Sequence, residues 1–406
     1  MTQPASPPVA GSMLVINGGS STLKFALFRA GDPPVRELSG SVDRIGSPDG
    51  TLRVVRGSAH TVERLTVRVP DHLACIEPLT ACVTDMLAHN PLRAIGHRVV
   101  HGGRHYREPR MVTPVVMEEL QRLSPYDPEH LPAEIALIKG FTQRYPHLPQ
   151  VVCFDTAFHS GMPPVARLLA IPRRYESAGV QRYGFHGLSY AFLMKELKRV
   201  GAPHEADGRV ILAHLGNGVS MAAVKGGKAV DTTMSFTPAS GLPMSRRSGD
   251  LDPGLVAYLA RTEDMSIDRF HQMVNTESGL LGVSELSPDM RELLERERSD
   301  PRAAEAVDLF CYQARKWIGA LAAALGGVDT VVFSAGIGEN SPVIRARICA
   351  GLEFLGVDID GARNESGHPV ISKEGGAVTV RVIHTDEESE IARSVVELLN
   401  ADSVEG

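Results

Sequence analysis

The sequence predicts a mixed α/β protein of two domains that repeat one order of elements. The chain has 406 residues, more than a single ordinary hydrophobic core serves. An apolar run, a turn of Gly with Ser or Asn, and a second apolar run occur over residues 13–28 and again over 210–224. Each such pattern is typical of a β-hairpin, and strand-like and helix-like segments alternate after both. We therefore expect a duplicated domain.

In the first half, short apolar segments follow the hairpin at 52–55 and 65–69, and a helix is expected over 72–87. Buried strands are expected at 94–100 and 151–154. This order predicts three antiparallel strands followed by strand–helix alternation.

In the second half, strands are expected at 209–216, 220–224 and 228–232, followed by a polar loop rich in Gly and Pro at 235–253. Connections of that length are uncommon unless they are functional. A helix is expected over 303–325, ended by Gly326 and Gly327. One face of this helix carries Val307, Phe310, Cys311, Ala314, Trp317, Ile318 and Leu321.

The segment after this helix combines a strand at 330–333 with a glycine-rich stretch at 335–342. Ser341 can cap a following helix and Pro342 can occupy its first turn.

The composition excludes several classes of protein. With 43% hydrophobic and 22% charged residues and a net charge of −6, the chain is typical of a soluble globular protein without nucleic-acid or membrane partners. No run of 18 apolar residues predicts a transmembrane helix, and residues 1–11 read as a frayed tail rather than a signal peptide. Five cysteines without CxxC spacing indicate reduced thiols, so we expect a cytoplasmic location.

The two hairpin tips are candidate phosphate sites. Glycines allow close approach of the backbone, and Ser20, Ser21 and Thr22 offer hydroxyl groups at the first tip. Two tips facing each other across a cleft would suit a polyphosphate nucleotide. The alternative for each is a plain hairpin turn.

Arginine, histidine and acidic side chains stand at strand ends and in loops. Arg98 lies at the end of a buried strand, where its charge requires a negatively charged partner. This partner is either a bound anion or, as the alternative, an acidic side chain in a structural salt bridge. Asp155 also ends a strand. His186 lies beside glycine and between aromatic residues, where a purely structural histidine is the alternative. Arg246 and Arg247 suit an oxyanion, unless their loop is simply a solvated surface.

Glu387 and Glu388 near the C-terminus either stabilise the positive end of a helix or offer carboxylates to Mg²⁺. The chain contains no Walker A motif, no full G-x-G-x-x-G fingerprint and no H-E-x-x-H. Arginines, histidines, glycine turns and a few acids are what phosphoryl transfer uses, because it depends on positioning and charge neutralisation.

Several of these segments together resemble the signature blocks of the acetate kinase family. They occur in the family's order from about residue 13 to 395, which makes the match specific. The matching blocks are residues 15–24, 96–103, 154–159, 182–187, 214–218, 236–238, 247–250, 335–342 and 385–388.

The resemblance implies a duplicated ribonuclease H-like (actin-like ATPase) fold with two domains around a central cleft. A disordered tail would comprise 1–12, domain I 13–158 with 388–406, and domain II 159–387. The implied activity is Mg²⁺-dependent (or Mn²⁺-dependent) reversible phosphoryl transfer from ATP to a short-chain carboxylate, acetate foremost. A homodimer is also implied. The alternatives are a propionate or other acyl kinase, and an actin-like nucleotide switch without acid kinase activity.

The resemblance also implies roles for individual residues. Arg98 and Arg247 would bind the acid and the transferring phosphoryl group, and His186 would stabilise its charge. Asp155 would order metal waters or the acceptor, and His130 completes the implied catalytic set. Arg98 with Val100, Phe185 and Pro238 would form the acid pocket, and Asn17 and Glu387 the metal site. The implied nucleotide contacts are Ser20, Thr22, Lys24, His214, Gly216, Asn217, Gly218, Gly336, Gly338 and Asn340.

One stretch departs from the family pattern. Where the family has Ala-Pro-Leu-His-Asn-Pro, this chain has Asp-Pro-Glu-His-Leu-Pro over 127–132, so an apolar pocket residue becomes Glu129. A carboxylate beside a carboxylate site is repelled unless it turns away or pairs. Strict specificity for acetate therefore depends on where Glu129 points.

Overall fold

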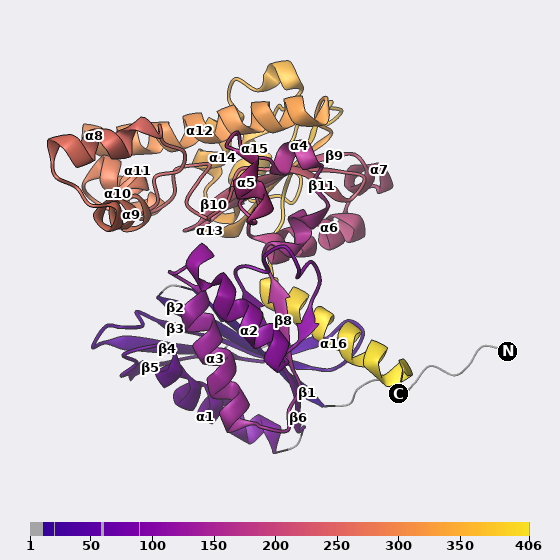
Figure 1. Cartoon of the computed structure of the whole chain (residues 1–406). Helices are drawn as coiled ribbons and strands as arrows, with labels where there is room; N and C mark the ends of the chain where they lie inside the picture. Colours follow the sequence, from indigo (N-terminus) through magenta and orange to yellow (C-terminus); the bar gives the residue numbers. More distant parts are fainter. Residues whose placement is uncertain (1–10, 20, 58–60, 89, 406) are drawn as a thin grey trace. The chain divides into compact units, whose positions relative to one another are not determined.

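A computed structural model describes residues 11–19, 21–57, 61–88 and 90–405 (Figure 1). The described residues divide into two compact units. Unit 1 comprises the residues up to Ala157 and those from Asp386 onward, and unit 2 comprises Phe158–Thr385. Each unit has its own β-sheet.

The sheet of unit 1 has an antiparallel run on one side and two parallel pairings on the other, where the edge strand β7 is again antiparallel to β8. Its order is β5-β4-β3-β2-β1-β6-β8-β7, in which β1 to β5 pair antiparallel, while β6 pairs parallel with β1 and β8 with β6. The strands are β1 (Ser12–Gly18), β2 (Thr22–Arg29), β3 (Val35–Asp43), β4 (Gly50–Arg56), β5 (Thr61–Val67), β6 (Leu92–Val99), β7 (Arg110–Met111) and β8 (Gln150–Phe154).

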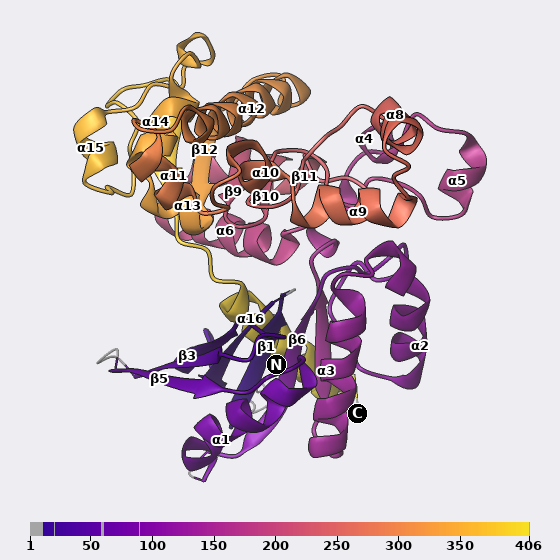
Figure 2. The same ribbon diagram turned by 90° about the vertical axis from the view of Figure 1, so that its left-hand side faces the viewer.

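Helices cover both faces of this sheet (Figure 2). Successive side chains of a strand point to opposite faces. Leu14 and Ile16 of β1 therefore join a core with α1 (Ile76–Leu87) and α3 (Leu131–Arg144). On the opposite face, Gly96 of β6 lies against α16 (Glu387–Glu405), so closely that an added Cβ would meet Ile391 at 2.6 Å.

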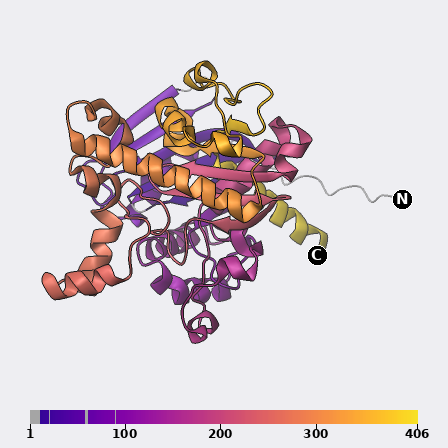
Figure 3. The ribbon, with the colours of Figure 1, turned by 90° about the horizontal axis from the view of Figure 1, so that it is seen from above.

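The sheet of unit 2 has the order β11-β10-β9-β12-β13. The helix α6 (Gly187–Val200) packs into the core on one face, and α12 (Pro301–Leu325) runs along β9 to β11 (Figure 3). The strands are β9 (Arg209–Leu215), β10 (Val219–Lys225), β11 (Lys228–Thr232), β12 (Thr330–Ser334) and β13 (Thr379–Val382).

The two sheets repeat one topology. The run β3-β2-β1-β6-β8 of unit 1 corresponds strand by strand to β11-β10-β9-β12-β13 of unit 2, with three antiparallel strands followed by two parallel ones. The predicted repeat of one order of elements is therefore confirmed. In unit 1, β4, β5 and β7 are additions at the two edges.

The remaining elements are short helices and turns. They are η1 (Leu73–Cys75), α2 (Pro114–Leu123), η2 (Ser124–Tyr126), η3 (Ala157–Gly161), α4 (Pro164–Arg167), α5 (Arg173–Ser177), α7 (Pro203–Asp207), α8 (Gly254–Thr262), α9 (Ile267–Thr276), α10 (Gly279–Ser284), α11 (Met290–Arg296), α13 (Ala335–Asn340), α14 (Pro342–Cys349), η4 (Glu353–Leu355) and α15 (Gly361–Glu365).

Some local expectations were confirmed and others were wrong. Ser341 caps α14 and Gly326 ends α12 in the left-handed conformation, as expected. The expectation of three antiparallel strands in the first half was wrong, because β1 to β5 form one antiparallel run. Trp317 is only partly buried, so it lies at the margin of the apolar face of α12.

Candidate active site

The first hairpin tip is short. Asn17 pairs with Lys24 in the β1–β2 ladder, so both lie within the strands rather than in the turn. The Gly19 N–H donates to the Thr22 carbonyl at 2.7 Å, so this amide closes the turn instead of facing a ligand. Lys24 is exposed. Ser20 lies outside the described residues.

Arg98 on β6 lies at the centre of an ion-pair cluster in unit 1. Its Nε and Nη2 donate to Asp155 Oδ2 at 3.0 and 2.6 Å, and its Nη1 donates to the Gly18 carbonyl at 2.9 Å. Only 13% of the Arg98 side chain is exposed, and Asp155 is fully buried. Burial lowers the pKa of Arg98, but Asp155 and further carboxylates outweigh it and raise the pKa above its usual value. The guanidinium is therefore a fixed cation beside the first hairpin.

A second buried acid completes this cluster. Glu134 on α3 accepts from Arg98 Nη1 at 3.3 Å and from the Val100 N–H at 2.9 Å. It thus contacts two of the residues predicted to bind the acid. Burial raises the pKa of Glu134 to about 8, against the opposing effect of Arg98 and the Val100 amide.

His130 is the N-cap residue of α3 and is buried. Its Nδ1 lies 2.8 Å from Asp127 Oδ1, and its backbone N–H donates to the same oxygen at 3.1 Å. The acid that replaces the family's alanine thus orients the histidine. Glu129 is exposed and therefore turned toward solvent, which relieves the repulsion raised by its position in the motif.

The proposed metal residues meet at the start of α16. Asn17 Nδ2 donates to Glu387 Oε2 and to Glu388 Oε1, both at 2.9 Å. In the part of the chain that the structure describes, no group of three His, Cys, Asp or Glu could ligate a metal alone. Two adjacent carboxylates nevertheless fit Mg²⁺, which commonly takes one or two protein carboxylates, substrate phosphates and waters.

In unit 2, two histidines stack beside the second hairpin. The rings of His186 and His214 lie 4.1 Å apart at 19°. His186 Nδ1 shares a hydrogen bond of 2.8 Å with the hydroxyl of Ser220 on β10, and His214 Nδ1 shares one of 2.8 Å with Ser189. His186 also has a φ of 59°, which is uncommon for a residue with a side chain. Such strain is often found at functional sites.

Gly218 at the second tip brings three predicted residues together. A Cβ added there would lie 3.1 Å from His186 Nε2 and 3.7 Å from Arg247 Nη1, so both side chains lie against the tip. Arg247 Nη1 donates to the Pro238 carbonyl at 3.1 Å, which anchors the long polar loop. Asn217 accepts from the Ser245 amide at 3.3 Å and ties this loop to the tip.

The segment after β12 lies next to this tip. A Cβ at Gly216 would meet the Ala335 Cβ at 3.4 Å. Within α13, Asn340 donates to the Gly336 carbonyl at 2.9 Å, and both residues are exposed. Arg345 on α14 is 1% exposed and donates to the carbonyls of Gly338 and Glu339, both at 2.9 Å, so it fixes the end of α13.

The predicted acid-pocket residues lie in both units. Val100 belongs to unit 1, whereas Phe185 and Pro238 belong to unit 2, and all are buried. His159 Nε2 donates to the Phe185 carbonyl at 3.0 Å, and burial lowers the pKa of His159 to about 4. His159, which lies within one of the matching blocks, therefore acts as a neutral structural residue.

Comparison with known proteins gives the family. The sequence profile of the Acetokinase family matches residues 12–393. The chain belongs to this family. An acetate kinase of Methylocella silvestris is 42% identical over 400 residues, which cover 96% of this chain and 98% of that protein. The resemblance found in the sequence is therefore confirmed.

Solved structures of the acetokinase family agree with the fold. The acetate kinase of Porphyromonas gingivalis is 35% identical with a TM-score of 0.86, covering 96% of this chain and 100% of that one. A propionate kinase of Francisella tularensis is 32% identical with a TM-score of 0.88, covering 95% and 98%. The predicted actin-like ATPase fold is thereby confirmed. Within the described ranges, no helix is long and apolar enough to span a membrane.

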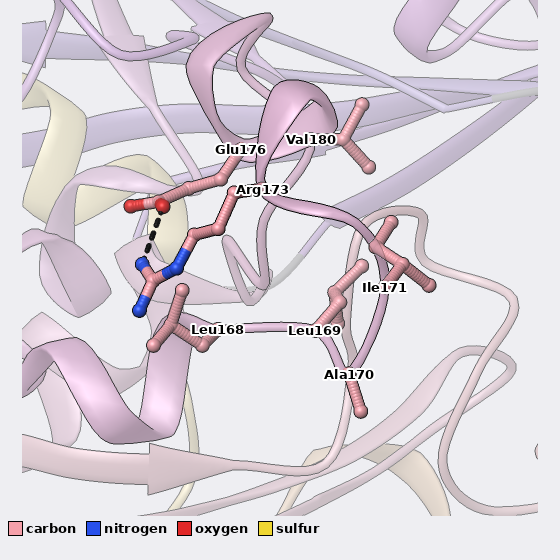
Figure 4. A pocket seen from close by; sticks show the side chains of 7 residues that line it. All are labelled: Leu168, Leu169, Ala170, Ile171, Arg173, Glu176 and Val180. Carbon is pink, nitrogen blue, oxygen red and sulfur yellow. Dashed lines mark hydrogen bonds and ion pairs between the residues drawn. The ribbon is translucent and has the colours of Figure 1, made fainter.

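The sequence reasoning missed several residues that this acetokinase family member uses to position the site. Glu134, Ser220 and Arg345 contact predicted site residues but have no motif of their own. A signal existed for Glu134, because it precedes the apolar Ile135 and lies one helical turn after His130. A pocket of about 250 Å³ lined by 168–171, Arg173, Glu176 and Val180 contains none of the predicted residues (Figure 4).

Proposed function

We propose that this chain transfers the γ-phosphoryl group of ATP reversibly to acetate, giving acetyl phosphate and ADP. The observation that carries the proposal is the arrangement at the second hairpin, where His186 and Arg247 lie against a glycine tip. A glycine turn allows a phosphate to approach the backbone, and the adjacent cation and imidazole offset its charge. Family membership over residues 12–393 supports the same reaction.

In the proposed step, an oxygen of the acetate carboxylate attacks the γ-phosphorus in line. The new O–P bond forms as the bond to the β-phosphate oxygen breaks, and ADP leaves with that electron pair. Arg247 and His186 stabilise the negative charge on the transferring group. The proposed contacts of the acid are Arg98, fixed by Asp155, with Val100 in unit 1, and Phe185 and Pro238 in unit 2. Gly216, Asn217, Gly336, Gly338 and Asn340 contact the nucleotide, together with His214, Thr22 and Lys24.

Glu387 and Glu388, bridged by Asn17, would bind Mg²⁺. When bound, the ion would neutralise charge on the phosphate oxygens. Asp155 and His130 complete the proposed catalytic set: Asp155 keeps Arg98 in place, and Asp127 orients His130.

A second candidate is a propionate kinase, which the similarity to the solved propionate kinase favours. The two differ in the size of the acid that the pocket accepts. An actin-like nucleotide switch is the remaining alternative. It needs phosphate-binding tips but not the buried Arg98–Asp155 pair.

A hydroxamate assay tests the proposal. The purified protein is incubated with Mg-ATP, hydroxylamine and either acetate, propionate or butyrate, and acyl hydroxamate is measured. Acetate should give the highest kcat/KM. A clear preference for propionate would replace the first candidate with the second. ADP release that does not depend on any acid would favour the nucleotide switch and overturn the proposed reaction.

We also propose that the enzyme is a cytoplasmic homodimer. Its five cysteines, all described, are free thiols, which supports a reducing compartment. Neither α8 nor α9 contains a buried residue, yet both carry large apolar side chains: Tyr258 is 59% exposed and Ile267 is 79% exposed. Such a surface fits an interface between copies.

Sedimentation of the variants Tyr258→Asp and Ile267→Asp tests the dimer. We expect the native protein to sediment as a dimer and the double variant as a monomer. A native protein that sediments as a monomer at micromolar concentration would contradict the homodimer without affecting the proposed reaction.

A further inference from the structure

Glu134 is a buried carboxyl group without an assigned role, one helical turn inside α3. It is 3% exposed, and its two oxygens contact different parts of the proposed acid site. Oε2 accepts from the backbone N–H of Val100 at 2.9 Å, and Oε1 accepts from Arg98 Nη1 at 3.3 Å. One side chain therefore positions both the cation and the backbone at that site.

The charges in this cluster do not balance when all the acids are ionised. Arg98 supplies one positive charge, while Asp155 and Glu134 each supply a negative one. Asp127, whose Oδ1 lies 2.8 Å from His130 Nδ1, also raises the pKa of Glu134, and Glu387 is a further carboxylate that acts on Arg98. A substrate carboxylate that approaches Arg98 then meets a cluster with excess negative charge. Like charges at this range oppose binding, and burial weakens the screening by water.

We propose that Glu134 is a positioning residue that takes up one proton from solvent when the acid substrate binds. The inference rests on the proposed function, because it needs a carboxylate bound at Arg98. On protonation the Glu134 carboxylate becomes a neutral carboxyl group, and the charge that it loses equals the charge that the substrate brings.

The geometry favours Glu134 over Asp155 as the proton acceptor. The contact from Arg98 to Glu134 is 3.3 Å long, whereas Asp155 receives two hydrogen bonds from Arg98, the shorter of 2.6 Å. Protonating Glu134 weakens only the longer contact and keeps the bond from the Val100 amide. Burial raises the pKa of Glu134 to about 8, close to the pH of the solution. A negative charge bound nearby raises this pKa further, so it converts ionised Glu134 to the protonated form.

The proposal fixes the sign of a pH dependence. Below the pKa of Glu134 the group is already protonated, and the affinity for acetate does not change with pH. Above this pKa a proton must bind with the acid, so the dissociation constant for acetate rises up to about tenfold per pH unit. Acetate itself stays ionised throughout this range.

Calorimetry measures the proton directly, without catalysis. Acetate is titrated into the protein at pH 8 in two buffers with different ionisation enthalpies. The pKa of Glu134 lies near this pH, so part of the free protein already carries the proton. We therefore expect an uptake of a fraction of a proton per acetate at pH 8 and a larger uptake, approaching one proton, at pH 9. An uptake near zero at both pH values would overturn the proposal.

Two variants identify the group. Glu134→Gln should remove proton uptake and make the KM for acetate independent of pH between 7 and 9. Glu119→Gln on α2 is the matched control: Glu119 is also buried in unit 1, but it pairs with Arg122. It should behave like the native protein. Proton uptake that persists in a folded Glu134→Gln variant would assign the proton elsewhere and refute the proposal.

This test is separate from that of the proposed function. An enzyme that forms acetyl hydroxamate but binds acetate without taking up a proton refutes only the role of Glu134. A protein that forms no acyl hydroxamate with any acid refutes the proposed function, whatever the calorimetry shows.

Discussion

Replacing Gly218 with alanine tests the contact between the second hairpin tip and His186. The added methyl group would lie 3.1 Å from His186 Nε2, whereas ordinary contacts begin at 3.4 Å, so the overlap is about 0.3 Å. The ring cannot easily retreat, because Ser220 holds its Nδ1 at 2.8 Å and His214 stacks on it. The φ of Gly218 lies outside the left-handed region, so alanine brings no backbone strain.

The expected loss of kcat follows from the displacement. A misplacement of 1 Å in an active site costs roughly 100-fold in rate, so a shift of about 0.3 Å costs about fourfold. The contact with Arg247 stays ordinary at 3.7 Å. We therefore expect Gly218→Ala to lower kcat about fourfold in the hydroxamate assay, with a loss of stability of about 1 kcal/mol.

Two control variants test whether the effect of Gly218→Ala acts through His186. Gly319→Ala on α12 adds a methyl group with no atom within 4 Å, so kcat should not change. In a His186→Ala background, Gly218→Ala should change kcat less than twofold, because the ring that it displaces is gone. Full activity in the single variant, or an unchanged effect without His186, would refute the reasoning.

Three further predictions concern other parts of the site and the fold. Arg98→Ala should lower kcat at least 100-fold in steady-state kinetics. Because it leaves a buried acid without its arginine partner, it should also lower the free energy of unfolding by about 3–5 kcal/mol in a denaturant titration. Near-native turnover would exclude Arg98 from the mechanism. Arg345→Met should raise the KM for ATP about tenfold and leave the KM for acetate unchanged. The reason is that the end of α13 loses the guanidinium group that donates to its carbonyls. Equal changes in the two KM values would contradict this role of Arg345. Burial lowers the pKa of His97 and His159 to about 4, below the unfolded value of 6.5, so the unfolded state binds more protons and stability falls as pH drops from 6.5 toward 4. At pH 5 each of these two histidines should lower the free energy of unfolding by about 2 kcal/mol relative to neutral pH. Urea titrations that show equal stability at pH 7 and pH 5 would refute this prediction.

Local patterns predicted the parts of the fold that short-range forces determine. Both hairpins, α12 and the cap at Ser341 follow from apolar runs, glycines and a capping side chain near in sequence. The strand β3 had no comparable signal. Within it only Leu38 and Val42 are buried, and the polar residues between them hide the alternation. The need for glycine at Gly40 comes from its tertiary neighbours, because an added Cβ would lie 2.4 Å from Phe25 Cζ and 2.6 Å from the Arg53 carbonyl oxygen.

Site residues could be predicted where they belong to motifs, but their partners could not. Arg98 was expected to meet an anion or an acid, and the structure supplies Asp155 and Glu134. An acid on a helix normally faces solvent, and the position of Glu134 one helical turn after His130 did not by itself indicate that its side chain is buried. Asn17 and Glu387 are 370 residues apart, and only the tertiary fold brings them within 2.9 Å.

The most direct test of the proposed reaction follows the oxygen atoms of the acid. Acetate labelled with ¹⁸O at both carboxylate oxygens is incubated with the protein and Mg-ATP, and the acetyl phosphate is examined by ³¹P NMR. Direct attack of the carboxylate on the γ-phosphorus predicts one ¹⁸O bonded to phosphorus, seen as a small upfield shift of the acetyl phosphate signal. Acetyl phosphate without ¹⁸O on phosphorus, or ATP hydrolysis to unlabelled phosphate with no acetyl phosphate, would contradict it.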